Sequence, residues 1–218
     1  MSRLSDDVLD MTFSLPRIYP ITDRAVSGLS HAEQVTRLIR GGATLIQLRE
    51  KDGAPQEFLR DAEAALAIAR ENNVRIIIND RVDIAMALKA DGVHLGQTDM
   101  PVEAARRLLG SQAMIGYSTH NLSQVEDAMR LPVDYIAFGP LFETSTKTDH
   151  EPLVGLNHLR EIKERLGQKP LVAIGGITGE NFGDTLTAGA DSAAIISDLL
   201  KEPAKIAEKL SRMMAIRD

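Results

Sequence analysis

The sequence of 218 residues contains no cysteine. Disulfides, thiolate metal sites and a cysteine nucleophile are therefore excluded. No apolar run approaches the ~20 residues that a membrane-spanning helix needs. The first 16 residues are polar and acidic and lack the apolar segment of a secretion signal. We therefore expect a cytoplasmic protein that does not enter a membrane.

An excess of positive charge is also missing. The formal net charge is −6, which argues against a general attraction to nucleic acid or to an anionic membrane. The sequence has no G-x-G-x-x-G, P-loop or G-x-S-x-G motif, and its histidines show no metal-binding spacing. Among them, His94 is predicted to be a packed strand residue rather than a ligand, and His120 is the one histidine kept as a candidate for the site. A locally positive pocket is still compatible with this composition.

Short β-branched runs alternate with longer helical patterns from Arg17 onward. The hydrophobic fraction of 44% is sufficient for a sizeable core. Spacings of a capping box at Ser30 with Glu33 and at Ser123 with Glu126 predict two helix starts. Glycines in "RGGA", "KADG" and "TAGAD" predict helix ends. The predicted strands cover residues 17–22, 44–49, 75–79, 92–95, 114–118, 135–139, 171–175 and 192–197.

This alternation predicts an α/β fold with a parallel sheet. Repetition over about 200 residues indicates a single (β/α)8 TIM barrel, and a doubly wound open sheet is the alternative. No linker splits the chain. We expect residues 16–218 to form the barrel and residues 1–15 to form a short N-terminal extension. The sequence leaves the oligomeric state open.

One strand carries an unusual set of polar side chains. In "LIQLREKDG", Gln47, Arg49 and Lys51 share one side of the chain. On a central strand such inward cations need anionic partners, because an unpaired buried charge costs several kcal/mol. The partners could be acidic side chains or the phosphates of a ligand. A solvated edge strand is the simpler alternative for an isolated strand.

Two acids follow neighbouring predicted strands. Asp80 comes directly after "IIIN", and Asp99 follows "GVHLGQ". Adjacent strands lie ~5 Å apart, so the two carboxylates could converge on a cation. Mg²⁺ accepts this kind of site, with few carboxylates and several waters. Alternatively, each aspartate could be the N-cap of the helix that follows.

The last strands and one long loop predict an anion site. "GGI" (175–177) and Ser197 follow the seventh and eighth strands, where barrels commonly bind phosphate. The loop after the sixth strand contains Thr144, Thr146 and Lys147, which supply hydroxyls and one ammonium group. Its length above the barrel mouth favours a functional role over a solvated loop.

Taken together, "YPITDR", "GGATLIQLREK", "IINDRVDIAMALKADGVHLGQTD", "GYSTHN", "FGPLFETSTK" and "AIGGI" resemble the thiamine-phosphate synthase family. The resemblance covers residues 17 to 200. It implies a transferase that joins 4-amino-2-methyl-5-hydroxymethylpyrimidine diphosphate to 4-methyl-5-(2-phosphoethyl)thiazole, giving thiamine phosphate and pyrophosphate. It also implies a dissociative displacement, which needs charge stabilisation by Mg²⁺ and cations rather than a strong base.

The resemblance further implies a role for each matching position. Asp80 and Asp99 would hold Mg²⁺. The catalytic groups would be Arg49, Lys51, Lys147 and Ser118, which stabilise and position the diphosphate. The remaining substrate contacts would be Gln47 and Asn79 on the pyrimidine diphosphate, and Thr144, Thr146, Gly176, Ile196 and Ser197 on the thiazole phosphate.

Three other functions remain to be distinguished. A thiazole tautomerase resembles the synthase and shares the "FET" step, but it generally lacks the "QLREK", "ND" and "Q.D" set present here. A non-catalytic sensor of thiamine phosphates would tolerate loss of Asp99 or Lys147, and neither is lost. A phosphosugar isomerase would need a carboxylate base inside the barrel. The sequence departs from the family's usual pattern at Glu143, where proline is common, and at "DSAAII" in the last strand.

Overall fold

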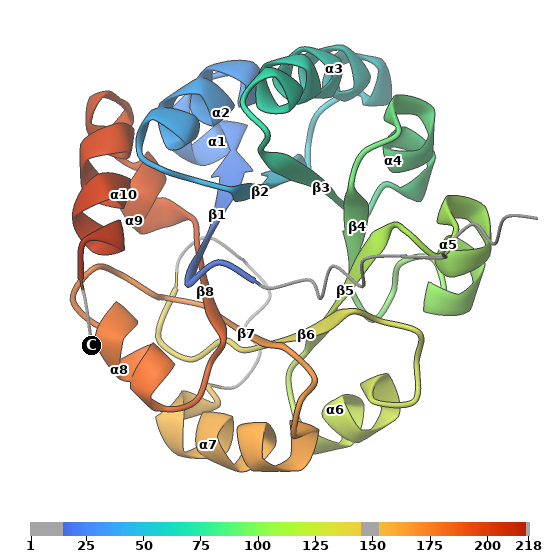
Figure 1. The fold of residues 1–218 in the computed structure, drawn as a ribbon, viewed down its shortest axis with the longest axis vertical. Helices are drawn as coiled ribbons and strands as arrows, with labels where there is room; N and C mark the ends of the chain where they lie inside the picture. Colours follow the sequence, from blue (N-terminus) through green and yellow to red (C-terminus); the bar gives the residue numbers. More distant parts are fainter. Residues whose placement is uncertain (1–14, 145–152, 217–218) are drawn as a thin grey trace, which may run out of the picture.

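Eight parallel strands close into a barrel in sequence order (Figure 1). The computed structural model describes residues 15–144 and 153–216. Closure brings β1 beside β8, with Ile18 opposite Ala193. The strands are β1 (Ile18–Asp23), β2 (Leu45–Arg49), β3 (Arg75–Asn79), β4 (Gly92–Leu95), β5 (Met114–Thr119), β6 (Tyr135–Phe138), β7 (Leu171–Ile174) and β8 (Ser192–Ile195).

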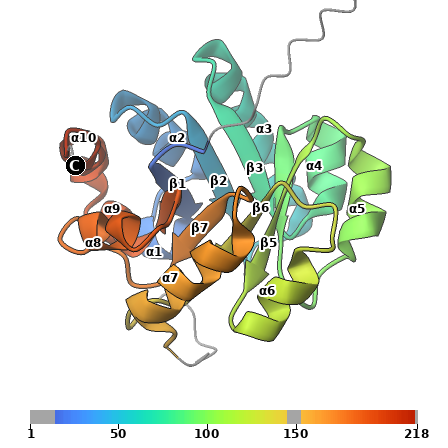
Figure 2. The same cartoon turned by 60° about the horizontal axis from the view of Figure 1, so that its bottom comes forward.

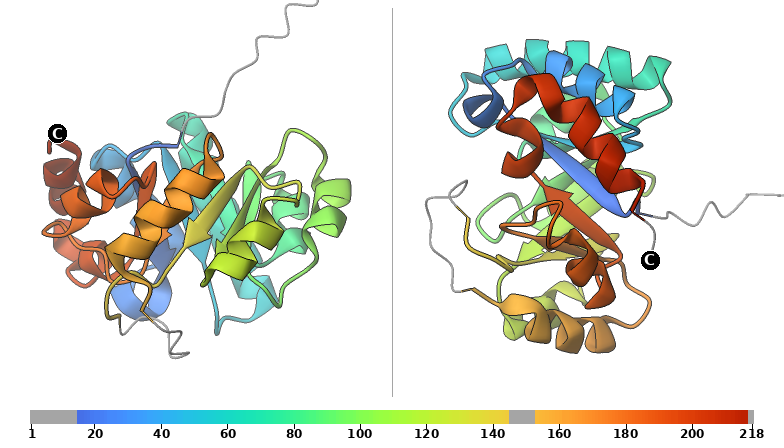
Figure 3. Two further views of the ribbon diagram at one scale, coloured as in Figure 1. Left: turned by 90° about the horizontal axis from the view of Figure 1, so that it is seen from below. Right: turned by 90° about the vertical axis from the view of Figure 1, so that its left-hand side faces the viewer.

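Helices form an outer ring around these strands, as the views of Figures 2 and 3 show. The C-terminal helix α10 packs beside α2 and completes the ring next to β1. The helical elements are α1 (Arg24–Ser27), α2 (His31–Arg40), α3 (Pro55–Glu71), α4 (Val82–Leu88), α5 (Val102–Leu109), α6 (Leu122–Ala128), α7 (Gly155–Leu166), α8 (Phe182–Thr187), α9 (Ser197–Leu200), the 3-10 turn η1 (Pro203–Lys205) and α10 (Ile206–Met214).

The predicted TIM barrel is confirmed, and the open-sheet alternative is wrong. Each predicted strand matches an observed strand to within two residues at either end. The match follows from burial on both faces: β-branched runs such as Ile76, Ile77 and Ile78 are almost completely buried. The proposed boundary between residues 1–15 and the barrel stays a prediction, because residues 1–14 lie outside the described part.

Helix ends agree with the sequence only in part. Ser30 and Glu33 form the predicted capping box of α2. The start predicted at Ser123 is wrong, since α6 begins at Leu122 and its N-cap is Asn121, whose side chain accepts from Gln124 N. Asparagine caps a helix as well as serine does, so the earlier residue takes the position. In "KADG" the helix α4 ends at Leu88, and its C-cap is Lys89, with φ +50°, rather than the glycine.

Aspartates attach the strands to one another at the amino-terminal face of the barrel. Asp91, Asp134 and Asp191 stand immediately before β4, β6 and β8. Their carboxylates accept backbone N–H groups at the start of β3, β5 and β7, at distances of 2.7, 2.7 and 2.8 Å. These bonds replace water on otherwise exposed strand ends. This face is therefore built for stability, and the polar residues at the opposite face are available for function.

Candidate active site

Gln47 and Arg49 extend from β2 into the barrel, at its carboxyl end. Gln47 is buried, and the Arg49 side chain is only 11% exposed. Arg49 forms an ion pair with Asp23, the residue opposite it in the register of β1 and β2. The inward cation predicted from the sequence therefore has an acidic partner, which is one of the two alternatives left open. The solvated edge strand is excluded, because β2 pairs with both β1 and β3.

Lys51 lies just beyond β2 and contacts the acid after the next strand. Its Nζ is 2.5 Å from Asp80 Oδ2. Asp80 adopts a left-handed backbone conformation with φ +61°, which aspartate and asparagine tolerate better than most residues. That conformation turns the chain sharply between β3 and α4. The ion pair thus joins two predicted site residues that are 29 positions apart in the sequence.

The carboxyl groups of Asp80 and Asp99 converge as the sequence predicted. Burial raises the pKa of Asp80, the Lys51 ammonium group opposes the rise, and Asp99, within side-chain hydrogen-bonding reach, adds to it. Neither aspartate is a helix N-cap, since Arg81 and Pro101 occupy those positions. Asp99 instead accepts from Gly96 N at 2.6 Å. Two acids held this close favour a shared cation.

A buried polar atom near these acids lacks a hydrogen-bond partner. Asn79, the last residue of β3, is 7% exposed, and its Nδ2 has no partner among the described residues. Leaving such a donor unsatisfied costs ~1–3 kcal/mol. A ligand with an acceptor atom at this position would remove the cost, so the atom is consistent with a binding site.

Ser118, near the end of β5, is linked to a buried histidine. Its Oγ lies 2.8 Å from His94 Nε2, and its backbone carbonyl accepts from Gln97 at 2.6 Å. His94 is 6% exposed in β4, as expected for a packed strand residue. His120 Nδ1 lies 2.7 Å from the carbonyl oxygen of Gly139 in the segment after β6. Both histidines are therefore engaged with protein groups.

The segment after β6 packs tightly against the two glycines after β7. Gly175 and Gly176 have φ +98° and +65°, and a Cβ on Gly176 would lie 2.4 Å from the carbonyl oxygen of Glu143. Only glycine combines this conformation with this approach. Thr144 follows Glu143, so the first residue of the predicted phosphate loop is near Gly176. Ile196 and Ser197 follow β8, which pairs with β7, whereas Thr146 and Lys147 lie outside the described residues.

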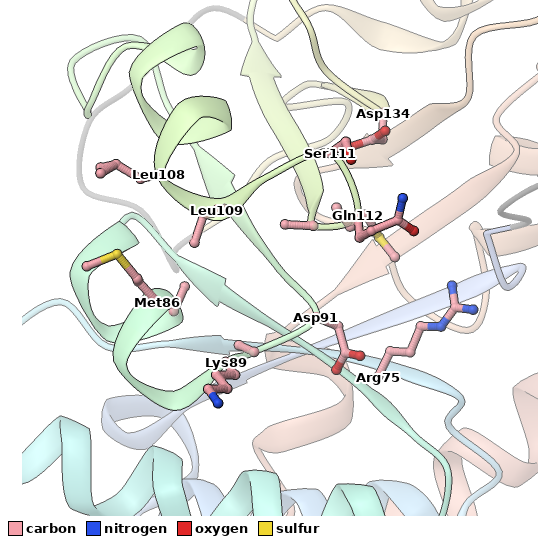
Figure 4. Close-up of a pocket in the computed structure, with 13 residues that line it drawn as sticks. Arg75, Met86, Lys89, Asp91, Leu108, Leu109, Ser111, Gln112 and Asp134 are labelled. Atoms are coloured by element: carbon pink, nitrogen blue, oxygen red, sulfur yellow. The ribbon is translucent and has the colours of Figure 1, made fainter.

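A cavity of about 620 Å³ opens on the opposite face, between α4 and α5 (Figure 4). Met86 and Leu108 are exposed along its edge, and Asp91 and Asp134 lie at its base. Both carboxylates already accept backbone N–H groups. None of the predicted site residues lines this cavity. The cavity is therefore separate from the barrel mouth, and its two carboxylates already hold strands together.

Asp80 and Asp99 are the candidate metal ligands of this site. Within residues 15–144 and 153–216, no group of three or more His, Cys, Asp or Glu side chains is arranged to hold a metal ion. Asp80 and Asp99 still offer hard oxygen ligands, which fit Mg²⁺ because this ion keeps several waters and commonly binds substrate phosphates.

No helix within residues 15–144 and 153–216 is long and apolar enough to cross a membrane.

Comparison with known proteins agrees with this geometry. A family model described as thiamine monophosphate synthase matches residues 18–199. The chain belongs to this family. A thiamine-phosphate synthase from Clostridium novyi is 45% identical over 186 residues, which cover 85% of this chain and 91% of that protein. One from Methanoregula boonei is 44% identical over 187 residues, or 85% and 86% of the two chains.

A solved structure of the same family has the same fold. Thiamine phosphate pyrophosphorylase from Pyrococcus furiosus superposes with a TM-score of 0.80 at 34% identity, covering 91% of this chain and 95% of that one. The family resemblance deduced from the motifs is thereby confirmed, and so is the expected barrel. The roles of individual residues stay predictions at this point.

Three residues attached to the site were missed from the sequence. Asp23 pairs with Arg49, and the hydroxyls of Tyr19 and Tyr135 connect Gln47 to His94 inside the barrel. The "YPITD" motif contains two of them, so the signal was present as part of the family pattern. The contact partners of these residues could not be predicted from the sequence, since each contact joins residues on different strands.

Proposed function

We propose that this chain is a thiamine-phosphate synthase. It joins 4-amino-2-methyl-5-hydroxymethylpyrimidine diphosphate to 4-methyl-5-(2-phosphoethyl)thiazole and releases pyrophosphate. The observation that carries this proposal is the cluster at the carboxyl ends of β2, β3 and β4, where Lys51, Asp80 and Asp99 meet next to the buried Arg49 and Asn79. Family membership supports the same reaction.

The cluster is suited to a diphosphate with its metal ion. Asp80 and Asp99 would hold Mg²⁺, which neutralises charge on the diphosphate oxygens when bound. Lys51 Nζ lies 2.5 Å from Asp80 Oδ2, and its half-exposed side chain would offer its ammonium group to a phosphate oxygen. Arg49 would provide a second positive charge from the barrel interior, and Asn79 Nδ2 would donate to an oxygen or a ring nitrogen.

The reaction needs charge stabilisation more than proton transfer. The bond between the pyrimidine methylene carbon and the diphosphate oxygen breaks, and its electron pair leaves with pyrophosphate. The thiazole nitrogen then donates its lone pair to that carbon and forms the new C–N bond. Positive groups held in a partly buried cleft stabilise the departing charge, and such fixed contacts typically contribute 10²–10³-fold each.

The thiazole phosphate would bind at the ends of β7 and β8. Gly176, Ile196 and Ser197 offer backbone N–H groups there, and Thr144 begins the loop packed against Gly176. Thr146 and Lys147 complete the proposed set from outside the described residues. The acceptor nitrogen would then face the pyrimidine from the far side of the barrel mouth.

Product analysis tests the proposal. Purified protein with Mg²⁺ and both substrates should form thiamine phosphate and pyrophosphate in equal amounts. Omitting either substrate should abolish thiamine phosphate. Formation of an aromatic thiazole phosphate from its tautomer, without any condensation, would show that the protein is the tautomerase instead.

A further inference from the structure

A chain of hydrogen bonds crosses the barrel interior from Gln47 to Ser118. Gln47 Nε2 donates to the Tyr19 hydroxyl at 3.2 Å, and this hydroxyl lies 3.1 Å from that of Tyr135. The Tyr135 hydroxyl is 3.0 Å from His94 Nδ1, and His94 Nε2 is 2.8 Å from Ser118 Oγ. The chain therefore connects two predicted substrate contacts through three residues with no assigned role.

This chain of hydrogen bonds is tightly packed and shielded from water. Tyr19 and Tyr135 are 1% and 0% exposed, and their rings meet edge to face with centroids 6.0 Å apart. The Tyr135 ring also stacks on His94 at 5.5 Å. A Cβ on Gly116 would lie 2.1 Å from Tyr135 Cζ, so the ring passes through space that only glycine leaves open. Burial raises the pKa of both tyrosines, so the hydroxyls keep their protons.

Counting donors gives the chain a direction. Each tyrosine hydroxyl has one hydrogen. If Gln47 donates to Tyr19 and each buried hydroxyl hydrogen has an acceptor within this set, Tyr19 donates to Tyr135, and Tyr135 donates to His94 Nδ1. A neutral His94 then carries its hydrogen on Nε2 and donates it to Ser118 Oγ. The Ser118 hydroxyl hydrogen is thereby directed away from the histidine.

The opposite direction requires the Gln47 amide to be rotated by 180°. Its oxygen would then accept from Tyr19, every bond would reverse, and Ser118 would donate to His94 Nε2. In that arrangement Ser118 presents only lone pairs to a ligand. A bound anion repels lone pairs and attracts an O–H group, so the two directions differ in their affinity for a diphosphate.

We propose that Tyr19, Tyr135 and His94 form a hydrogen-bond relay that fixes the Nε2–H tautomer of His94 and so makes Ser118 a hydrogen-bond donor to the bound diphosphate. The inference rests on the proposed function, in which Ser118 contacts that group. Tyr19, Tyr135 and His94 are positioning residues on this account, because they act through Ser118. At the other end, the same direction leaves Gln47 Oε1 as an acceptor for the amino group of the pyrimidine.

The tautomer of His94 is directly measurable. Full-length protein labelled with ¹⁵N-histidine, with Mg²⁺ and pyrophosphate, should show His94 protonated at Nε2 and not at Nδ1 in long-range ¹H–¹⁵N spectra. The His94→Gln variant assigns the signal. A protonated Nδ1 in this complex would overturn the proposal.

Removal of single hydroxyls tests the relay itself. Tyr135→Phe keeps the ring but removes the donor to His94 Nδ1, so the His94 hydrogen should no longer be confined to Nε2. The variant should also lower kcat by about tenfold to a hundredfold, the range for a misdirected hydrogen bond to a charged group. Tyr19→Phe should have a smaller effect, because Tyr135 can still donate to His94. Tyr117→Phe on β5, outside the chain of hydrogen bonds, is the matched control and should change neither quantity.

Two outcomes separate the possible errors. A Tyr135→Phe variant that loses stability and activity but keeps the Nε2–H tautomer would show a purely structural role and overturn the relay. A wild-type protein that forms no thiamine phosphate would contradict the proposed function. The tautomer measurement needs only Mg²⁺ and pyrophosphate, without turnover, and still decides the relay in that case.

Discussion

Lys51 Nζ and Asp80 Oδ2 form an ion pair at 2.5 Å across the ends of two neighbouring strands. The pair has a second acid, Asp99, within hydrogen-bonding reach of Asp80. Two carboxylates and one ammonium group leave a net negative charge that a bound metal ion would neutralise, and Lys51 would then be available to a phosphate. The predictions below follow from this arrangement.

Removing the positive charge of Lys51 should slow the reaction. We expect Lys51→Gln to lower kcat by about 10²–10³-fold, because the lost charge acts on the leaving diphosphate. Lys205→Gln is a suitable control, since Lys205 forms a similar exposed pair with Glu202 at 2.6 Å and is not among the predicted site residues. Steady-state pyrophosphate release measures both variants. Equal rates for the two would place Lys51 outside the site.

The acid at position 80 should reduce stability while serving function. Its pKa in the folded protein is raised above the ordinary value of 3.8, chiefly by burial. The folded state therefore binds this proton more tightly than the unfolded state, and stability is lost as the pH rises from 3.8 through the raised value. Asparagine tolerates the left-handed conformation at φ +61° and carries no charge.

We therefore expect Asp80→Asn to be inactive but more stable than wild type at neutral pH. The gain in Tm should shrink as the pH is lowered toward about 4, where Asp80 becomes protonated in both states. Thermal unfolding at several pH values, without Mg²⁺, measures this difference. A variant less stable than wild type at neutral pH would show that the Lys51 contact outweighs the burial cost.

Replacing Asp99 should weaken metal binding. Asp99→Asn keeps an acceptor for Gly96 N and removes the charge. Outer-shell changes at metal sites cost 10–100-fold in affinity, so loss of a direct ligand should raise the half-saturating Mg²⁺ concentration by at least about tenfold. The KM for the thiazole phosphate should change little. Asp127→Asn, an exposed acid paired with Arg130, is the control, and an equal effect of both variants would reject the metal assignment.

Breaking the ion pair of Asp23 with Arg49 should destabilise the fold. Both side chains are largely buried, at 6% and 11% exposure. Asp23→Asn still caps α1 but leaves Arg49 unpaired, which typically costs ~3–5 kcal/mol. Urea unfolding should show this loss, and Mg²⁺ with pyrophosphate should restore part of it. The exposed pair of Asp83 with Arg81 is the comparison, and Asp83→Asn should cost less than ~1 kcal/mol.

Local sequence patterns were sufficient to predict the barrel, but they carry no information about which side chains meet across strands. Hydrophobic runs such as 75–79 and the capping box at Ser30 depend on residues close in sequence. The pairing of Asp23 with Arg49 depends on the register of β1 and β2. The contact of Tyr19 with Tyr135 joins residues 116 positions apart and exists only because the barrel closes.

The site likewise has features that the sequence predicts and contacts that only the structure shows. Asp80 and Asp99 could be brought together by reasoning from neighbouring strands, and their carboxyl groups do converge. The choice between a ligand and an acidic partner for Lys51 could not be made from the sequence, since Asp80 pairs with it in the structure and the proposed diphosphate would compete for the same ammonium group. The helix start at Ser123 was wrong for a smaller reason, because Asn121 offers an equally good cap two residues earlier.

A crystal soaked with Mg²⁺ and pyrophosphate tests the central claim most directly. The account predicts electron density for pyrophosphate at the carboxyl ends of β2 and β3, in contact with Lys51, and a metal ion bound by Asp80 and Asp99. Pyrophosphate found elsewhere, with Lys51 still paired to Asp80 and no metal between the two acids, would contradict it.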